Sequence, residues 1–251
     1  MEFPHSANLK KSNLNIVKCV KFVKIMCGRF SFHQAPETVA ELFKLAGITQ
    51  IKPRYNIAPT QAVPTVLQGE ETQDRQFQMM RWGLIPSWAK DMKIGAKMIN
   101  ARSETVAEKP SFRSPFRRRR CWILADGFYE WETTDSGKQP FYFQLKEGEP
   151  FAFAGLWERW QSPEGELLES CTILTTEANE LMSRIHVRMP VILPPTSRDR
   201  WLDPATPPEE LHPLLTPYDS EEMICYPVSR MVNTPKTDSP DCVQPIAALE
   251  R

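Results

Sequence analysis

Apolar residues recur with a helical period soon after residue 35. The residues that share this period, at i, i+3, i+4 and i+7, are Val39, Leu42, Phe43 and Ala46. This spacing puts their side chains on one face of a helix. Pro36 stands near the start and Gly47 just beyond the end, which are positions these residues favour at helix boundaries. The pattern predicts a short surface helix packed on a core.

Most of the remaining pattern is typical of strands. In QPFYFQL, residues 139–145, apolar side chains alternate along the segment, as they do when one face of a strand is buried. The other candidate strands are CWILADGFYEW (121–131), PFAFAGLW (150–157), SCTILTT (170–176) and MPVIL (189–193). Further helical segments are predicted at about 177–185, 196–202 and 207–215. We therefore predict an α+β fold with a largely antiparallel sheet or barrel-like core, flanked by short helices.

The length of 251 residues suits one large domain, and the 23 prolines are spread along the chain without a repeat. Residues 1–26 differ from the rest, because they hold five lysines against the single acid Glu2. They form a poor secretory signal, since lysines interrupt the only apolar stretch. Two explanations stay open: a miscalled upstream start codon, or a genuine leader removed by cleavage. Under either one we expect a single domain over 27–251.

Composition excludes several classes of protein. The sequence contains no apolar run of about 18 residues, the length a membrane span needs, so we expect a soluble protein. Six cysteines without a CxxC pair favour the reducing cytoplasm. HExxH, Walker, GxGxxG and GxSxG motifs are absent from the sequence, so no metal and no cofactor are predicted.

The net charge of zero hides an uneven distribution. Residues 1–120 hold 21 Lys and Arg against 9 Asp and Glu. One face of the protein, drawn mainly from the first half, is therefore expected to meet a polyanion.

Cys27 is the first candidate for chemistry. It follows Met26 and precedes a glycine, so removal of everything up to Met26 would leave a cysteine with a free α-amine. About a tenth of such an amine is neutral at pH 7, and the neutral form attacks aldehydes. The neighbouring thiol can then add to the same carbon and close a five-membered thiazolidine. The alternative is an internal Cys27 that serves as a small core residue.

Four polar residues are candidates to assist Cys27. In DGFYEW, alternation puts Glu130 on the same face as Phe128. If that face is inward, burial would raise the pKa of Glu130 and suit it to proton transfer. The alternative is a solvated or ion-paired residue on the strand. His186, between two arginines, could transfer a proton near pH 7 or serve only a structural role. Asn100 and Arg102 would share one face of a strand and could hold a sugar and a phosphate, unless the arginine simply pairs with Glu104.

A basic and aromatic stretch follows. Arg113 and the run 117–120 interleave with Trp82, Trp88, Phe112, Phe116 and Trp122. Grooves of this composition bind single-stranded nucleic acids, with rings as stacking platforms and arginines on the backbone. We expect one or two of these rings to be exposed and the others to belong to the core.

The motifs occur in a recognisable order: MCGRF, PRYNIAPT, RWGLIPSWA, INARSET, ADGFYEW, TTEANELMSRIHVRMPVIL and YPVSRMVN. In this order the sequence resembles the SOS-response-associated peptidase (SRAP) family from Cys27 to about residue 236. The resemblance implies that Cys27 crosslinks to abasic sites in single-stranded DNA and that the protein can expose this cysteine by autoproteolysis. It further implies that Asn100 orients the deoxyribose, Glu130 is the general acid and base, and His186 protonates the sugar oxygen.

The resemblance also points to residues that contact DNA. They are Gly28, Arg29, Asn56, Pro59, Trp88, Arg102, Thr175 and Arg188. Pro110 stands near a position where some relatives carry a DNA-contacting arginine, and we expect Arg113 to substitute for it.

The expected partner is therefore single-stranded DNA that contains abasic sites, met in the cytoplasm and, once crosslinked, at the nucleoid. Replication machinery is a candidate partner, a monomer is the default state, and weak strand cleavage at abasic sites is an expected side activity. Two rival hypotheses remain. The first is a cysteine peptidase that uses Cys27 and His186 on other proteins. The second is a non-covalent single-strand binder.

Overall fold

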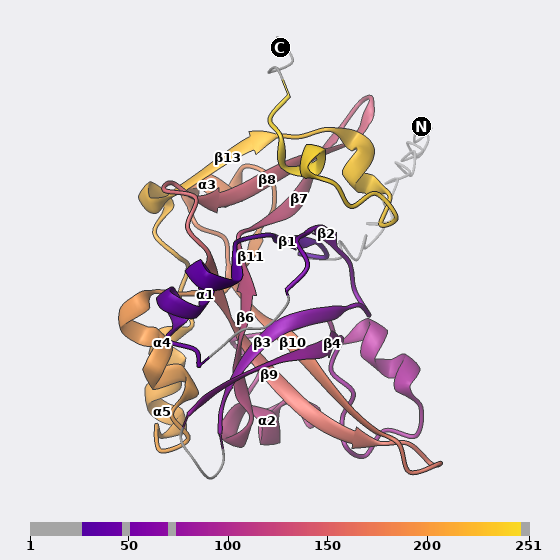
Figure 1. The fold of residues 1–251 in the computed structure, drawn as a ribbon, viewed down its shortest axis with the longest axis vertical. Coiled ribbons are helices and arrows are strands. Elements are labelled where there is room, and N and C mark those ends of the chain that lie inside the picture. The colour runs from indigo at the N-terminus through magenta and orange to yellow at the C-terminus, as the bar shows by residue number, and fades with distance from the viewer. Residues whose placement is uncertain (1–26, 47–50, 70–73, 247–251) are drawn as a thin grey trace, which may run out of the picture.

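A five-stranded closed barrel forms the larger part of the protein (Figure 1). The computed structural model describes residues 27–46, 51–69 and 74–246, so the predicted appendage 1–26 lies outside the described residues. The barrel strands, in neighbour order, are β4 (Arg75–Trp82), β3 (Ala62–Gln68), β6 (Arg120–Ala125), β9 (Phe151–Gln161) and β10 (Leu167–Glu177). The parallel pairing of β10 with β4 closes the ring, and the other pairs are antiparallel.

Three short strands extend the barrel beside its last two strands. β5 (Asn100–Arg102) pairs in parallel with β10, and β11 (Arg188–Pro190) pairs with β10 in antiparallel orientation. β12 (Ile192–Leu193) pairs with β9. β10 thus carries β5 and β11 near its carboxyl end, where three sequence-distant motifs meet.

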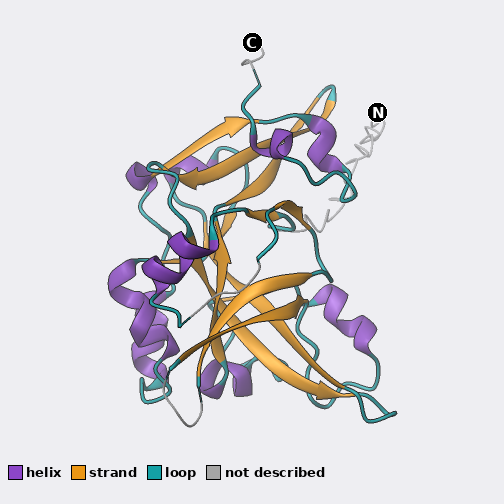
Figure 2. Cartoon of the chain, in the orientation of Figure 1, coloured by secondary structure: helices purple, strands orange, loops and turns teal. Residues whose placement is uncertain are grey.

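A second sheet lies above the barrel in Figures 1 and 2. Its order is β13 (Met223–Pro227), β8 (Gly137–Leu145), β7 (Gly127–Thr134), β1 (Phe30–Phe32) and β2 (Arg54–Ile57). All of its pairs are antiparallel. The two sheets share one apolar core, because Phe30 of β1 packs edge-on against Trp82 of β4 and Phe153 of β9.

Short helices cover the flanks (Figure 2). The α-helices are α1 (Pro36–Phe43), α2 (Arg113–Arg118), α3 (Glu180–Ser183), α4 (Pro195–Leu202) and α5 (Pro208–Leu211). The 3₁₀ helices are η1 (Met92–Lys97), η2 (His212–Leu214), η3 (Ser220–Glu222), η4 (Arg230–Asn233) and η5 (Pro240–Val243). The predicted α+β fold, with a largely antiparallel barrel-like core and short flanking helices, is confirmed. Within the described ranges, no helix is long and apolar enough to cross a membrane.

Two predicted elements end or break earlier than expected. The first helix stops at Phe43 because Lys44 turns into the left-handed region, with φ 51°, and donates its N–H back to the helix. The segment predicted as one strand over 121–131 forms two strands in different sheets, β6 and β7. At the break, the carboxylate of Asp126 accepts the backbone N–H of His33. Gly127 follows, where a Cβ would overlap the ring of Tyr142.

Candidate active site

Cys27 lies at the junction of the two sheets, directly before β1. Its backbone nitrogen donates to Oε1 of Glu130 at 2.5 Å, and Nδ2 of Asn100 donates to its carbonyl oxygen at 3.2 Å. The pairing of Phe30 with Phe128 holds β1 against β7 and so brings residue 27 to residue 130. The structure thus brings Cys27, Asn100 and Glu130 together from positions far apart in the sequence.

Glu130 is buried, with 2% of its surface exposed. Strand alternation predicts its orientation correctly: Phe128 belongs to the main core, whereas Tyr129 packs with Tyr142 in a separate cluster on the other face. Across the sheet Glu130 is paired with Phe141 of β8. A carboxylate in this position is shielded from water, which strengthens its interactions with charges and donors nearby.

The Cys27 thiol is also buried, with 1% of the residue exposed. Burial, and next the charge of Glu130, raise the pKa of the thiol well above its ordinary value, although a backbone hydrogen bond at Arg29 opposes this. The thiol is therefore protonated at neutral pH. A protonated thiol is a poor nucleophile, so chemistry that starts with a thiolate is disfavoured here.

His186 follows α3 and is buried, with 5% exposed. Its Nδ1 lies 3.1 Å from the backbone nitrogen and 3.1 Å from the carbonyl oxygen of Arg188. When the N–H of Arg188 donates to Nδ1, the proton of the neutral ring sits on Nε2. The backbone of β11 thus fixes how this ring is oriented.

The predicted DNA contacts Arg102, Thr175 and Arg188 meet around β10. Thr175 is paired with Arg102 of β5 on one side and with Pro190 of β11 on the other. Nη2 of Arg188 donates to the carbonyl oxygen of Thr175 at 2.7 Å. Arg102 is exposed and Arg188 is half-buried, whereas Thr175 is buried.

Glu104 is the acid that pairs with Arg188 through both carboxylate oxygens. Hydrogen bonding from Arg188 lowers the pKa of Glu104. The sequence raised Arg102 as the partner of Glu104; the charge of Arg102 does help to lower the pKa of Glu104, but its hydrogen-bonding partner is Arg188. The reason is the register: β11 lies beside β10 and brings Arg188 to Glu104 from 84 positions away.

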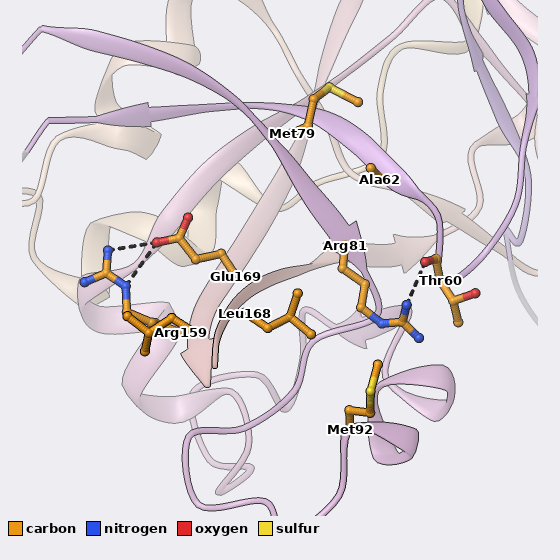
Figure 3. A pocket seen from close by; sticks show the side chains of 9 residues that line it. Thr60, Ala62, Met79, Arg81, Met92, Arg159, Leu168 and Glu169 are labelled. Atoms are coloured by element: carbon orange, nitrogen blue, oxygen red, sulfur yellow. Dashed lines mark hydrogen bonds and ion pairs between the residues drawn. The ribbon is translucent and has the colours of Figure 1, made fainter. Parts of the chain in front are cut away.

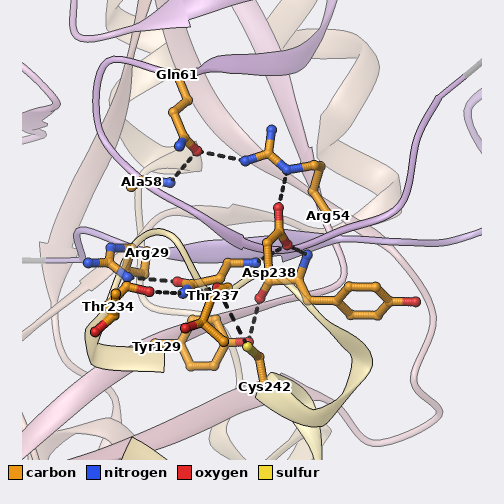
Figure 4. Close-up of polar contacts among 11 residues, drawn as sticks. Arg29, Arg54, Ala58, Gln61, Tyr129, Thr234, Thr237, Asp238 and Cys242 are labelled. Atoms are coloured by element: carbon orange, nitrogen blue, oxygen red, sulfur yellow. Dashed lines mark hydrogen bonds and ion pairs between the residues drawn. The ribbon is translucent and has the colours of Figure 1, made fainter. Parts of the chain in front are cut away.

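Arg29 belongs to a polar network that joins β2 of the second sheet to residues 232–238 (Figure 4), and Asn56 of β2 is part of the same network. Nη1 of Arg29 donates to Oδ1 of Asn56 at 2.7 Å and to the carbonyl oxygen of Val232 at 2.8 Å. Asn56 is fully buried, and its Nδ2 donates to the carbonyl oxygens of Val232, Thr234 and Thr237. Both side chains thus hold protein groups in this structure.

The other predicted DNA contacts lie at or near the surface. Trp88 is 59% exposed and Arg113 is exposed, whereas Gly28 and Pro59 are half-buried.

The predicted basic and aromatic patch is only partly at the surface. Arg120 is buried and donates to the carbonyl oxygens of Trp201, Phe116, Arg117 and Asp203. Arg119 pairs with Glu158 at 2.7 Å. The patch therefore keeps Arg113, Arg117 and Arg118 as exposed cations. The prediction is wrong for the other two, because β6 begins at Arg120 and carries it into the core.

The rings of the patch follow the same division. Trp82, Trp122 and Phe116 are fully buried, and the two indoles donate to the carbonyl oxygens of Ile99 and Arg198. Phe112 is half-buried, and Trp88 is the exposed ring. This agrees with the expectation that one or two rings would be exposed.

A cavity of about 740 Å³ lies on the barrel, away from Cys27 (Figure 3). Its lining residues are Thr60, Ala62, Met79, Arg81, Met92, Arg159, Leu167, Leu168 and Glu169. Arg159 and Glu169 form an ion pair at 2.8 Å, and Arg81 donates to the carbonyl oxygen of Thr60. None of the predicted catalytic residues lines this cavity. The described residues hold no cluster of three or more metal-ligating side chains either.

The chain combines a closed barrel and a second sheet, and a candidate aminothiol lies at their junction. Comparison with known proteins assigns it to a family. The chain belongs to the SOS response associated peptidase (SRAP) family, whose model matches residues 26–235. It is 47% identical over 224 residues to abasic site processing protein YoqW of Bacillus subtilis (strain 168), covering 87% of this chain and 99% of YoqW.

More distant relatives agree. The chain is 36% identical over 226 residues to abasic site processing protein HMCES of Gallus gallus, covering 78% of this chain and 67% of HMCES. A crystal structure of a protein from Bacteroides thetaiotaomicron is similar with a TM-score of 0.78 at 29% identity, covering 88% of this chain and 100% of that one. The family resemblance noted in the sequence is confirmed.

Proposed function

We propose that this protein captures abasic sites in single-stranded DNA as a covalent adduct of Cys27. The observation that carries the proposal is the 2.5 Å contact between the nitrogen of Cys27 and Oε1 of Glu130, with Asn100 on the adjoining carbonyl oxygen. The names of the relatives, abasic site processing proteins, support the substrate. The chemistry needs a free α-amine on Cys27, so everything before that residue must be removed.

The proposed reaction begins with ring opening. His186 gives a proton to the ring oxygen of the abasic deoxyribose while the C1′ hydroxyl loses its proton to solvent, so the bond between C1′ and the ring oxygen breaks and the C1′ aldehyde forms. Glu130 takes a proton from the Cys27 ammonium, and the neutral amine then adds to C1′. Loss of water forms the imine. Asn100 binds the sugar and the Cys27 carbonyl oxygen, which holds the amine close to the C1′ aldehyde.

The thiol completes the linkage. Its sulfur adds to C1′ of the imine, and its proton passes to the nitrogen, which closes the thiazolidine ring. A thiol that is protonated in the resting protein fits this order, in which the amine attacks first. If ring closure fails, the imine can lose the 3′ phosphate by β-elimination, so we also propose weak lyase activity.

Arg102 and Arg188 are proposed to bind phosphates, since each brings a guanidinium to the edge of β10 near Thr175. Gly28, Pro59 and Trp88 are proposed contacts for the sugars and bases, and Arg113 is a proposed distal phosphate contact. Arg29, which is half-buried, is proposed to contact DNA directly, whereas Asn56, which is fully buried, is proposed to contribute by holding Arg29.

Four further properties are proposed with this function. The protein removes the segment before Cys27 by its own peptidase activity, acts as a monomer and meets DNA at sites of replication. The five cysteines among the described residues are free thiols, which suits a reducing cytoplasm and, after crosslinking, the nucleoid.

The deciding experiment compares a protein expressed from Met26 with the full 251-residue chain. YoqW aligns over 99% of its own length with 87% of this chain, so the aligned part forms a whole protein in that relative. Intact mass establishes whether Cys27 is the first residue. Each protein is then mixed with single-stranded DNA holding one abasic site and run on a denaturing gel beside Cys27→Ala.

A heat-stable adduct that requires Cys27 as the first residue is the expected result. An adduct from the full chain as well, together with a mass that begins at Cys27, would support self-processing. Salt-reversible binding without an adduct would favour the non-covalent binder instead. Cleavage of unrelated peptides would favour a peptidase that acts in trans.

A further inference from the structure

The segment 228–238, which leads out of β13 through η4, is joined to the edge strand β2 by one carboxylate (Figure 4). Oδ1 of Asp238 accepts the backbone N–H of Tyr55 at 2.6 Å and that of Asn56 at 3.0 Å. Its Oδ2 accepts from the guanidinium of Arg54. One side chain thus binds three consecutive residues of β2 from 182 or more positions away.

Asn56 carries this connection inward. Its Nδ2 donates to the carbonyl oxygens of Val232, Thr234 and Thr237 at 3.1, 3.1 and 2.7 Å, and its Oδ1 accepts from Arg29 at 2.7 Å. A fully buried amide must have its polar atoms bonded, because leaving one without a partner costs roughly 1–3 kcal/mol. Asn56 therefore fixes the position of the backbone of residues 232–237 relative to the side chain of Arg29.

Arg29 is held from several directions. Besides Asn56, its guanidinium donates to Val232 O at 2.8 Å and to Asn233 O at 3.4 Å, and its charge lies 6.0 Å from the ring centroid of Trp131. Trp131 in turn donates to Oδ1 of Asn233 at 2.6 Å. Burial lowers the pKa of Arg29, which remains a cation.

The backbone of Arg29 is tied to the reaction centre. Its carbonyl oxygen accepts the N–H of Tyr129 at 3.0 Å, one residue before Glu130. Cys27 lies two residues away on the other side, within about 7 Å along the chain. A shift of the Arg29 side chain would therefore displace the Cys27 nitrogen relative to the carboxylate of Glu130.

From this geometry we propose that Asp238 is a positioning residue, which acts through Asn56 and Arg29 to set where the reacting nitrogen of Cys27 lies against Glu130. The proposal rests on the proposed function for the reaction that it supports. Neither Asp238 nor the segment 228–238 touches the reacting atoms.

The test uses Asp238→Ala and Asp238→Asn, after intact mass shows that Cys27 is the first residue. Asparagine keeps an oxygen that can accept from Tyr55 and Asn56, whereas alanine removes it. Arg75→Gln is the stability control, because Arg75 bonds Phe43 O and Asp199 beside α1 and α4, outside the network. Thermal unfolding of all variants is recorded first.

The first readout is the single-turnover adduct rate against DNA concentration. We expect Asp238→Ala to slow the rate at saturating DNA by about 10- to 100-fold, as a displacement of about 1 Å does. The half-saturating DNA concentration should change less than the rate, because Arg29 keeps its charge in the variant, and Asp238→Asn should recover most of the rate. The proposal is overturned by a loss no larger than that of Arg75→Gln, by a loss confined to DNA affinity, or by no rescue from asparagine.

The second readout needs no DNA. Glyoxylate condenses through its aldehyde with the neutral α-amine of an N-terminal cysteine, and the pH dependence of this modification, followed by intact mass, reports the pKa of the amine. A nearby carboxylate raises that pKa above about 7.7–8.0, so we expect Asp238→Ala to bring it down toward this range and Arg75→Gln to leave it unchanged. An unchanged profile in Asp238→Ala would overturn the proposal. If the wild-type protein forms no adduct with abasic DNA, the proposed function fails, and this profile still decides the positioning role.

Discussion

Replacing Glu130 by glutamine tests whether the carboxylate serves as the base for the Cys27 amine. The variant keeps the shape of the side chain and a hydrogen-bonding oxygen, but loses the negative charge 2.5 Å from the Cys27 nitrogen. Two opposing effects follow. Loss of a general base slows such reactions by about 10²- to 10⁴-fold, whereas removal of the charge lowers the pKa of the amine and so increases its neutral fraction.

The magnitudes decide which effect dominates. With the carboxylate present, its negative charge favours the ammonium form, so less than about a tenth of the amine is neutral at pH 7. Without it, roughly a tenth is neutral at pH 7 and nearly all at pH 9. Even a gain of about tenfold at pH 7 is smaller than the whole range of about 10²- to 10⁴-fold expected for the loss of the base. Glu130→Gln should therefore be slower by about 10- to 10³-fold at pH 7.

The same numbers predict the pH dependence of the deficit. From pH 7 to pH 9 the neutral amine of the variant increases from roughly a tenth to nearly all, whereas in the wild type Glu130 already takes the proton from the ammonium at pH 7. The deficit should therefore narrow as the pH rises, by up to about tenfold. The assay is the single-turnover adduct rate with abasic single-stranded DNA, measured on denaturing gels at each pH. An undiminished rate at pH 7, or a deficit that stays the same or widens as the pH rises, would refute the assigned role of Glu130.

Three further predictions concern other parts of the protein. Gly127→Ala should lower the free energy of unfolding in urea by about 1–3 kcal/mol, because a Cβ there overlaps the ring of Tyr142. Glu104 has a lowered pKa in the folded protein, so its pair with Arg188 stabilises the fold above the ordinary pKa of glutamate, and this contribution is lost as the pH falls below it. Glu104→Gln should therefore reduce the change in the free energy of unfolding between acid and neutral pH. The reduction should be at most about 1 kcal/mol, because the carboxylate is half-exposed. Arg102→Gln should reduce the slope of log affinity against log salt for single-stranded DNA by about 0.7 without changing the melting temperature.

Local patterns in the sequence account for the elements and for much of the site. The helical period from Pro36 and the alternation in Phe128 to Trp131 depend on contacts within a few residues, so they could be recognised without a structure. Alternation also places Glu130 on the core side of β7, where it is found buried. Cys27, Asn100 and His186 could be named from the motifs that surround them.

Other features follow from contacts between distant segments. The parallel pairing of β10 with β4 closes the barrel and has no signal in either strand alone. Arg120 looks like one more surface cation, but it becomes buried because four carbonyl oxygens from two neighbouring segments, 116–117 and 201–203, accept its donors.

The sequence by itself determined the first helix, most of the strand segments between residues 121 and 193 and which residue types carry the chemistry, because these depend on periodicity and on intrinsic reactivity. Only the tertiary structure decided that Asn56 is a buried connector and that Asp238 binds β2 from 182 positions away. Such roles arise when chain closure brings together polar groups that must bond one another once they leave water. No pattern of neighbouring residues can encode that requirement.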